Sequence, residues 1–437
     1  MNLDPVWAYF VLMTVVVGIA ALPLFRFIDN APNPGARYST IDGLRGFLAL
    51  AVFVFHLLVT HRFIETGIWD VPDSRFYALL GPVGVSLFFM ITGFLFWEKM
   101  LRAKGRPRWR ELYIGRLFRI GPMYLFVVLV MLYIVFTRTG FQLHESADVV
   151  AGSVLQWLAL GMIDTQPDVN GYRASHVLAG VTWTIWYEWA FYASLMATAV
   201  FARGKAHLIF VFAALAACLG GKILLSVDAM GIAVLFLSGM AVASLLHENI
   251  RPRISNNVSS TIALACLGVV FATSDSGYGT FSAMLLALFF YLVCSGTSVF
   301  GLLTTTPARR LGNISYSLYL MQGLVLTLVF AIAPLRDFAM ASPQQYWVAS
   351  IVCVCVLLLG AALGYALIER PGIALGQRLI RRRTPTTGSP QRGADMKRGA
   401  SAGTPGSHVP AGEVTAGGIY ERRDTGTALK LSQFTGL

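Results

Sequence analysis

Long apolar runs separated by short polar segments dominate the chain. Eleven of these runs approach the roughly twenty residues that a helix needs to cross a bilayer. They lie at 6–28, 43–60, 79–97, 116–136, 177–201, 206–225, 229–246, 259–274, 280–300, 313–333 and 346–369. The pattern predicts an all-α fold, a polytopic membrane helix bundle with about eleven transmembrane helices.

A further apolar run, 148–163, is shorter than the others. Basic loops tend to stay in the cytoplasm, so we place the basic loop 98–118 there. The other basic segments then also lie in the cytoplasm, but only if the run 148–163 does not cross the membrane completely. We therefore expect a re-entrant or interfacial helix within a long outer loop, 137–176. The N-terminus then lies outside the cell and the C-terminus lies in the cytoplasm.

Composition suggests three regions along the chain. Residues 1–30 form a predicted N-terminal transmembrane anchor, because Arg26 follows the first apolar run and no basic segment precedes it, unlike in a signal peptide. Residues 38–373 form the predicted membrane domain. Residues 376–437 are rich in Gly, Thr, Ser and Pro with scattered charge, which predicts a disordered basic cytoplasmic tail.

Charge and composition exclude a soluble protein. Of 437 residues, 56% are hydrophobic and only 13% are charged, whereas soluble domains carry about 25% charged residues. The formal net charge of +12 is concentrated in 98–119 and in the tail. Because these basic residues flank apolar runs, they predict orientation in the membrane rather than nucleic-acid binding. The five cysteines lie within apolar runs without zinc-site spacing, and no metal is expected.

The second apolar run carries the first candidate site. It begins with Asp42-Gly-Leu-Arg45-Gly, and His56 follows eleven residues after Arg45. Eleven residues make about three helical turns, so Arg45 and His56 share a face roughly 16 Å apart along the axis, and Asp42 lies near that face. This spacing fits a long, thin substrate with an anionic head and a reactive far end. The alternative is a snorkelling arginine and a core histidine bonded to a carbonyl group.

Two further runs carry charged residues. Arg116 and Arg119 lie one turn apart at the inner end of a span. Their guanidinium groups could bind phosphate oxygens, or they could simply anchor the helix at the cytoplasmic side. Glu188 lies about ten residues into its span, near the middle of the bilayer, so its carboxyl group must be neutral, paired or functional. His56 is the expected partner by depth, and a His–Glu pair could orient the imidazole or relay a proton.

A polar stripe marks the run that begins at 313. Tyr316, Tyr319 and Gln322 recur every three residues on an otherwise apolar helix. Together with Trp183, which begins the segment ending in Glu188, they are candidates for binding a hydroxyl-bearing acceptor. Hydrogen bonding between helices is the alternative interpretation of the stripe.

These motifs, in this order, resemble the acyltransferase-3 family of integral membrane proteins, and the resemblance covers about residues 40–371. It rests on Asp42-Gly-Leu-Arg45-Gly with His56, Phe88-Phe89-x-x-Thr92-Gly93-Phe94, Arg116-x-x-Arg119-Ile-x-Pro122-x-Tyr124, the Trp183 to Glu188 segment, Ser315-Tyr316-Ser-Leu-Tyr319-Leu and Glu369-Arg370-Pro371. The family uses acyl-CoA to modify surface polysaccharides and other hydroxylated acceptors. The resemblance implies a ten-helix core, to which this chain adds one N-terminal span.

The resemblance also implies roles for individual residues. His56 matches the essential catalytic histidine, Arg45 and Arg119 match residues that help to bind the acyl donor, and Glu188 matches the acidic end of a tryptophan motif. The chain departs from the family at Thr92, where serine is common.

Two further departures concern the later motifs. The segment Trp183-Thr-Ile-Trp-Tyr-Glu188 replaces Trp-Ser-Leu-x-x-Glu, and Gln322 stands where a histidine often occurs. These differences affect the acceptor side of the site rather than the donor chemistry.

The sequence therefore predicts a membrane O-acyltransferase that moves an acyl group, expected to be acetyl, from acyl-CoA to a hydroxyl group of a surface or lipid-linked glycan. The phosphates of the donor lie near Arg45, Arg116 and Arg119. His56, oriented by Glu188 or Asp42, acts as a general base or carries the acyl group covalently.

Acyl-CoA, or acetyl-CoA, is expected as a co-substrate, with no permanently bound cofactor. The expected surroundings are the lipid of a bacterial inner membrane, and the sequence does not indicate an oligomeric state. One alternative function is acylation of a small-molecule acceptor such as a macrolide. Another is proton-coupled transport, because buried histidine and glutamate also mark proton relays.

Overall fold

The computed structural model describes residues 3, 5–29, 38–225 and 228–381. Helices account for most of these residues, and no strand occurs among them, which confirms the predicted all-α membrane bundle. The chain divides into two units, Met1–Gly376 and Gln377–Leu437. From residue 382 onward, the predicted tail lies outside the described residues.

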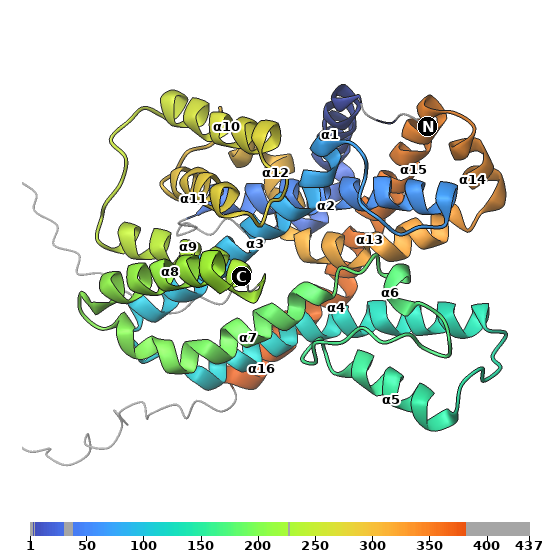
Figure 1. The fold of residues 1–437 in the computed structure, drawn as a ribbon, viewed down its shortest axis with the longest axis horizontal. Helices are drawn as coiled ribbons and strands as arrows, with labels where there is room; N and C mark the ends of the chain where they lie inside the picture. Colours follow the sequence, from blue (N-terminus) through green and yellow to red (C-terminus); the bar gives the residue numbers. More distant parts are fainter. Residues whose placement is uncertain (1–2, 4, 30–37, 226–227, 382–437) are drawn as a thin grey trace, which may run out of the picture. The chain divides into compact units, whose positions relative to one another are not determined.

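The helices follow one another with short connections (Figure 1). They are α1 (Val6–Ala21), η1 (Pro23–Ile28), α2 (Ser39–Thr66), α3 (Arg75–Arg102), α4 (Trp109–Arg138), α5 (Ala147–Leu158), α6 (Ala174–Val177), α7 (Trp183–Thr198), η2 (Ala199–Ala202), α8 (Ala206–Leu225), α9 (Asp228–His247), α10 (Asn256–Thr273), α11 (Thr280–Cys294), η3 (Leu302–Thr304), α12 (Thr306–Asn313), α13 (Ser315–Phe330), α14 (Ala333–Met340), α15 (Pro343–Gly364), η4 (Tyr365–Glu369) and α16 (Arg370–Arg381).

The number of helices that can span a membrane is lower than the sequence predicts. Six helices within the described ranges are long and apolar enough, or seven if the bent pair α12 and α13 forms one span. Every predicted run contains a helix, but α1, α7 and α11 have 16, 16 and 15 residues. Because a straight span needs about twenty residues, the predicted count of eleven is not reached.

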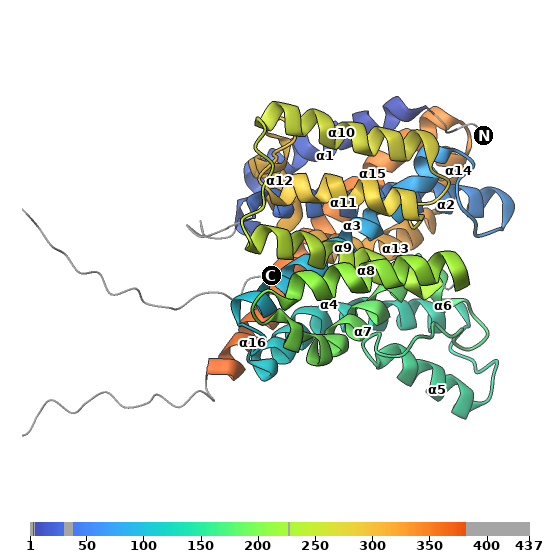
Figure 2. The same ribbon diagram turned by 60° about the vertical axis from the view of Figure 1, so that its left-hand side comes forward.

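Helices α2 and α3 pack along each other, and α3 also packs closely against α9. In Figure 2, α10 and α11 lie on one side of α3 and α9, whereas α8 and α7 lie on the other. Glycine permits the α3–α9 contact, because a Cβ atom added at Gly93 would overlap the backbone oxygen of Phe236. Likewise, one added at Gly239 would overlap the backbone oxygen of Met90. The motif containing Gly93 therefore serves helix packing.

The start of α2 contacts η3 and α12 backbone to backbone. A Cβ atom added at Gly43 would overlap the carbonyl oxygen of Leu303, and one added at Gly312 would overlap the carbonyl oxygen of Asp42. Both glycines are buried within the bundle. The glycine positions of the Asp42-Gly-Leu-Arg45-Gly motif therefore fix the position of the helix turn that carries Asp42 and Arg45.

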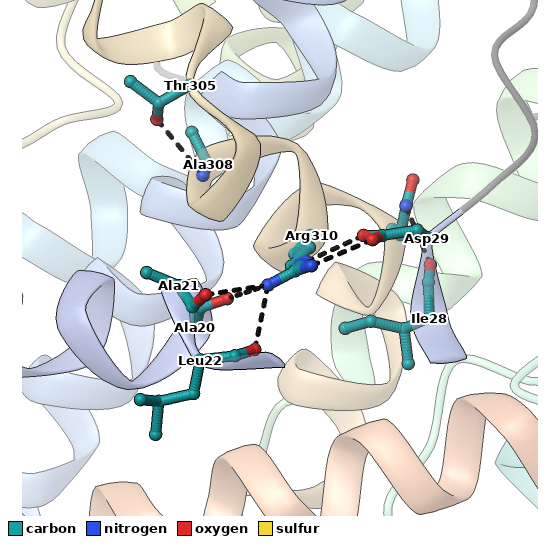
Figure 3. A network of polar contacts seen from close by, with 9 residues as sticks. Ala20, Ala21, Leu22, Ile28, Asp29, Thr305, Ala308 and Arg310 are labelled. Carbon is teal, nitrogen blue, oxygen red and sulfur yellow. Dashed lines mark hydrogen bonds and ion pairs between the residues drawn. The ribbon is translucent and has the colours of Figure 1, made fainter. Parts of the chain in front are cut away.

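A single arginine of α12 holds the end of the N-terminal helix (Figure 3). The Arg310 Nη1 group donates to the carbonyl oxygens of Ala20, Ala21 and Leu22, at 2.9, 3.2 and 3.0 Å. Its Nε and Nη2 groups donate to the two carboxylate oxygens of Asp29, at 2.7 and 2.9 Å. This hydrogen bonding holds the pKa of Asp29 below its usual value. Arg310 thus caps α1 and ties the N-terminal segment to the bundle.

The segment around α5 enters and leaves at the same end of α4. Near that end, Asn170 donates to Thr139 Oγ1 (3.0 Å) and accepts from the His144 backbone N–H (2.7 Å). At the tip, the Tyr124 hydroxyl donates to the carbonyl oxygen of Trp157 (3.0 Å). Fifteen residues of α4 separate Tyr124 from Thr139, which is about 22 Å along the axis. The segment therefore folds back along α4, and its predicted re-entrant position in the membrane stays a prediction.

The capping arginine generates a stability prediction. Arg310→Met leaves three carbonyl oxygens and the Asp29 carboxylate without their donors, so we expect it to destabilise the protein by about 2–4 kcal/mol. The change is measured as a lower melting temperature of the detergent-solubilised protein. Arg336→Met is the control, because the Arg336–Asp337 ion pair is exposed. Equal melting temperatures for the two variants would contradict the capping role of Arg310.

The contact between α2 and α12 generates a second prediction. Gly312→Ala forces the two backbones apart, and we expect a loss of at least about 1–3 kcal/mol of stability. Gly115→Ala in α4 is the control, since an added Cβ atom meets nothing within 4 Å there, and alanine favours a helix. Thermal melting of both purified variants compares them directly. A Gly312→Ala protein as stable as the Gly115→Ala protein would refute the close approach.

Candidate functional site

A cluster of charged side chains lies where the start of α2, α4, α7 and η4 come together. It comprises three arginines and three acidic residues, namely Arg45, Arg116, Arg119, Asp42, Glu188 and Glu369. All of them are at least half-buried. Because buried charge is costly in a membrane domain, the way these groups pair determines what the cluster can bind.

Glu369 is the most deeply buried member of the cluster. Its side chain is fully buried and forms an ion pair with Arg119, at 3.5 Å between Oε1 and Nη2. Its Oε2 atom accepts a hydrogen bond from the Ser317 hydroxyl at 2.8 Å. Glu369 ends the π-helical turn Tyr365–Glu369, and such turns inside helices are frequent at functional sites. The carboxylate therefore orients the Arg119 guanidinium group.

The sequence did not assign Glu369 to the site. It was noted only as part of Glu369-Arg370-Pro371. The usable signal was the presence of a carboxylate in the last turn of an apolar run, which requires a cationic partner.

Arg45 lacks a direct partner. Within the described parts of the chain, no hydrogen bond or ion pair engages its guanidinium group. Its electrostatic neighbours are Asp42 and Glu369, which attract it, and Arg119 and Arg116, which repel it. Since several cations converge and the Arg45 N–H donors are not used, the start of α2 can accept an added anion.

Arg116 and Glu188 are connected through an aromatic side chain. The Arg116 guanidinium carbon lies 4.2 Å from the ring centroid of Phe96 and 5.9 Å from that of Tyr192. The Tyr192 hydroxyl donates to Glu188 Oε2 at 2.7 Å. Tyr192 is one turn after Glu188 on α7, a spacing that brings side chains together. The sequence analysis did not identify Tyr192.

The predicted pair between His56 and Glu188 is not observed. Among the described residues, neither side chain has the other among its hydrogen-bond or electrostatic partners. The prediction matched the two groups by depth alone, and depth does not determine which side of a helix a residue faces. Glu188 faces Tyr192 and Arg116 instead. The expectation that Glu188 orients the imidazole is therefore corrected.

His56 is oriented by the backbone of its own helix. Its Nδ1 atom lies 3.0 Å from the carbonyl oxygen of Val52, one turn earlier. A carbonyl oxygen only accepts, so Nδ1 carries the proton in the neutral ring and Nε2 keeps its lone pair. The side chain of Gln322 lies near the ring. The arrangement leaves one basic nitrogen available.

The polar stripe on α13 separates into two parts. The Tyr316 hydroxyl donates to the carbonyl oxygen of Ile120 (2.9 Å), and the Tyr319 hydroxyl donates to that of Val181 (3.0 Å). These are the interhelical hydrogen bonds of the alternative interpretation. Gln322 differs, because it is fully buried and its Oε1 atom has no hydrogen-bond partner in the described residues. Gln322 therefore remains the member of the stripe best placed to contact a substrate near His56.

Trp183 lies in the first turn of α7, beside a pocket. Its ring contacts those of Phe89, Tyr187 and Tyr278. The pocket has a volume of about 420 Å³, including space open to the surroundings, and Trp183 and Trp186 form part of its lining. Trp183 thus lies between the aromatic core and an accessible cavity.

The predicted site residues consequently form two groups joined by two helices. Asp42, Arg116, Arg119 and Glu188 belong to the charged cluster that also contains Arg45, whereas Gln322 lies beside His56. Helix α2 carries both Arg45 and His56. Helix α13 carries Ser317, which contacts Glu369, and also Gln322. The geometry offers an anion-binding end and a basic nitrogen along the same helix.

Comparison with known proteins yields one match. The family model described as "Acyltransferase domain" covers residues 38–366. No curated protein and no solved structure matches the chain.

The buried ion pair generates the third prediction. Glu369→Met leaves Arg119 without its partner, and breaking a buried pair costs about 3–5 kcal/mol. Arg119→Met combined with Glu369→Met removes both charges and should recover at least about 1 kcal/mol relative to the sum of the single variants. Chemical or thermal unfolding of the four proteins gives this coupling. Strictly additive effects would show that the pair is not coupled.

Proposed function

The chain belongs to the acyltransferase-3 family and is a multi-pass membrane acyltransferase; from that premise we propose that it transfers an acyl group, expected to be acetyl, from acyl-CoA to a hydroxyl group of a surface or lipid-linked glycan. The observation that carries the proposal is the pairing, on helix α2, of an arginine that no described residue contacts directly and a histidine with one available nitrogen. Arg45 and His56 lie about 16 Å apart along the same face.

The charged cluster is the proposed binding site for the phosphates of the donor. Arg45 supplies N–H donors that no described residue uses. Arg119, held by Glu369, and Arg116, stacked on Phe96, supply two more guanidinium groups. Planar guanidinium groups bind phosphate oxygens in pairs. The acyl end of a donor bound here would extend along α2 towards His56.

His56 is the proposed general base. As the acceptor oxygen attacks the thioester carbonyl carbon, Nε2 takes the proton of the hydroxyl group. The tetrahedral intermediate then collapses, the carbon–sulfur bond breaks, and the thiolate of CoA takes up that proton. In the neutral ring, the hydrogen bond from Nδ1 to the Val52 carbonyl oxygen leaves the lone pair on Nε2. Base catalysis of this kind contributes about 10²–10⁴-fold.

The proposed topology places the donor site at the cytoplasmic side. The basic loop between α3 and α4 precedes Arg116 and Arg119 by two to three helical turns, and positive loops remain in the cytoplasm. The segment around α5 then enters from the opposite side. We propose the inner membrane of a bacterium as the location, with the N-terminus outside and the C-terminus inside.

Substitution of the histidine tests the proposal. His56→Ala should lower kcat for acyl transfer from acetyl-CoA to extracted surface glycan by about 10²–10⁴-fold, while binding of acetyl-CoA to the purified protein is retained. His144→Ala, at an exposed position on the outer loop, is the control and should keep full activity. Unchanged transfer by His56→Ala would remove the general-base role.

A second variant separates donor binding from catalysis. Arg45→Met should weaken acetyl-CoA binding at least tenfold, because it removes the N–H donors offered to the phosphates. Isothermal titration calorimetry measures this directly. If the wild-type protein does not bind acetyl-CoA, the proposed donor is wrong.

A further inference from the structure

We propose that the pocket between the re-entrant segment and the start of α7 is a carbohydrate-binding subsite that holds one sugar ring of the acceptor next to the reaction centre. This inference rests on the proposed transfer to a glycan. It names the part of the molecule that selects the acceptor, which Tyr124 of α4 and Trp183 and Trp186 of α7 line.

The pocket combines aromatic walls with a polar rim. Trp157, Trp183 and Trp186 line it together with Gln156 and Asp164, among others. Its empty volume of about 420 Å³ includes space open to the surroundings. Tryptophan rings and hydrogen-bonding amide and carboxylate groups therefore line the same cavity.

This lining fits a sugar ring better than the other candidate ligands. A pyranose presents apolar C–H groups on its faces and hydroxyl groups around its edge, so it can stack on indole rings and hydrogen-bond to amides at the same time. An acyl chain would lie beside the Asp164 carboxylate and the amide groups of Gln156 and Gln166 without hydrogen-bonding to any of them. A phosphate group would lie beside Asp164, and no arginine or lysine lines this pocket.

The loop that forms the rim is held in place before any ligand binds. The Gln166 amide donates to Thr182 Oγ1 at 2.9 Å, and the Thr165 hydroxyl donates to Gln156 Oε1 at 2.8 Å. The indole N–H of Trp157 donates to the carbonyl oxygen of Pro167 at 2.9 Å. Because these bonds order the loop in advance, binding of a ligand costs less conformational entropy.

Short contacts connect the pocket with the histidine. Thr182 lines the pocket. Two residues later in the chain, the Thr184 hydroxyl oxygen lies 3.1 Å from the hydroxyl oxygen of Tyr319. The Gln322 amide donates to the carbonyl oxygen of Tyr319 at 2.9 Å, and Gln322 lies beside His56. Side-chain contacts through Thr184 and Tyr319 thus lead from the turn of α7 that lines the pocket to Gln322. The neighbouring ring of the same glycan can present its hydroxyl group there.

Trp186 is the best position for a test. It lines the pocket one turn after Trp183, and within the described residues its indole makes no ring contact and no hydrogen bond. Trp186→Ala therefore removes a stacking surface with little effect on the core. Trp186→Phe keeps an aromatic face, and Trp7→Ala on α1, where the side chain is 66% exposed, is the matched control.

The experiment uses the full chain in membrane vesicles, with acetyl-CoA and unmodified surface glycan extracted from cells that lack the gene. Trp186→Ala should raise KM for the glycan at least tenfold and change kcat and KM for acetyl-CoA less than twofold. Trp186→Phe should restore most of the affinity, and Trp7→Ala should behave as wild type. Melting temperatures confirm that the variants fold equally well.

Three outcomes would overturn the inference while leaving the proposed function intact. These are an unchanged KM for the glycan in Trp186→Ala, a loss confined to kcat, or an equal loss in Trp7→Ala. If wild-type vesicles transfer no acetyl group to the glycan although they bind acetyl-CoA, the proposed acceptor fails first, and the carbohydrate subsite fails with it.

Discussion

The backbone contact between α2 and α12 determines where most of the functional side chains lie. Without side chains at Gly43 and Gly312, the first turn of α2 rests directly on η3 and α12. This contact fixes Asp42 and Arg45 at the base of the site. Helix α12 then continues, after a bend of 69°, into α13, which carries the polar residues beside Glu369 and His56. Arg310 on the same short helix also holds the N-terminal segment, so one packing contact connects the anchor, the charged cluster and the proposed base.

The charged groups of the cluster differ in how completely each one is paired. Glu369 is fully buried, and it has both an ion pair and a hydrogen bond. Arg116 is stabilised by stacking on an aromatic ring, and Glu188 accepts from the Tyr192 hydroxyl. Arg45 and Asp42 have electrostatic neighbours without a direct contact in the described region. A cation without a direct contact is stable there only if an anion or water completes its pairing, and the phosphates of the proposed donor would supply that anion.

The sequence predicted the helical membrane class and the family, because hydrophobic periodicity and motif residues depend on local composition. It could not predict lateral pairing. Glu188 was matched to His56 by depth, but the rotation of α7 about its axis depends on where the helix begins. It begins at Trp183 rather than near 177, since Ala179 and Gly180 adopt positive φ angles of 53° and 68° and interrupt the helix. The role of Glu369 depends on an ion pair between α4 and η4, and no sequence pattern contains that information.

The absence of a carboxylate next to His56 in the described residues has a chemical consequence. A carboxylate partner would strengthen the base by stabilising the imidazolium ion, whereas a carbonyl partner mainly fixes the tautomer. If His56 is the base, its reactivity then depends more on the position of the acceptor than on a charged partner. Under the proposed function, the catalytic rate depends on how well the acceptor hydroxyl is placed, and this placement falls to Gln322 and to the tryptophan-lined pocket beyond Tyr319. The same placement of the acceptor would then both select it and activate its hydroxyl group.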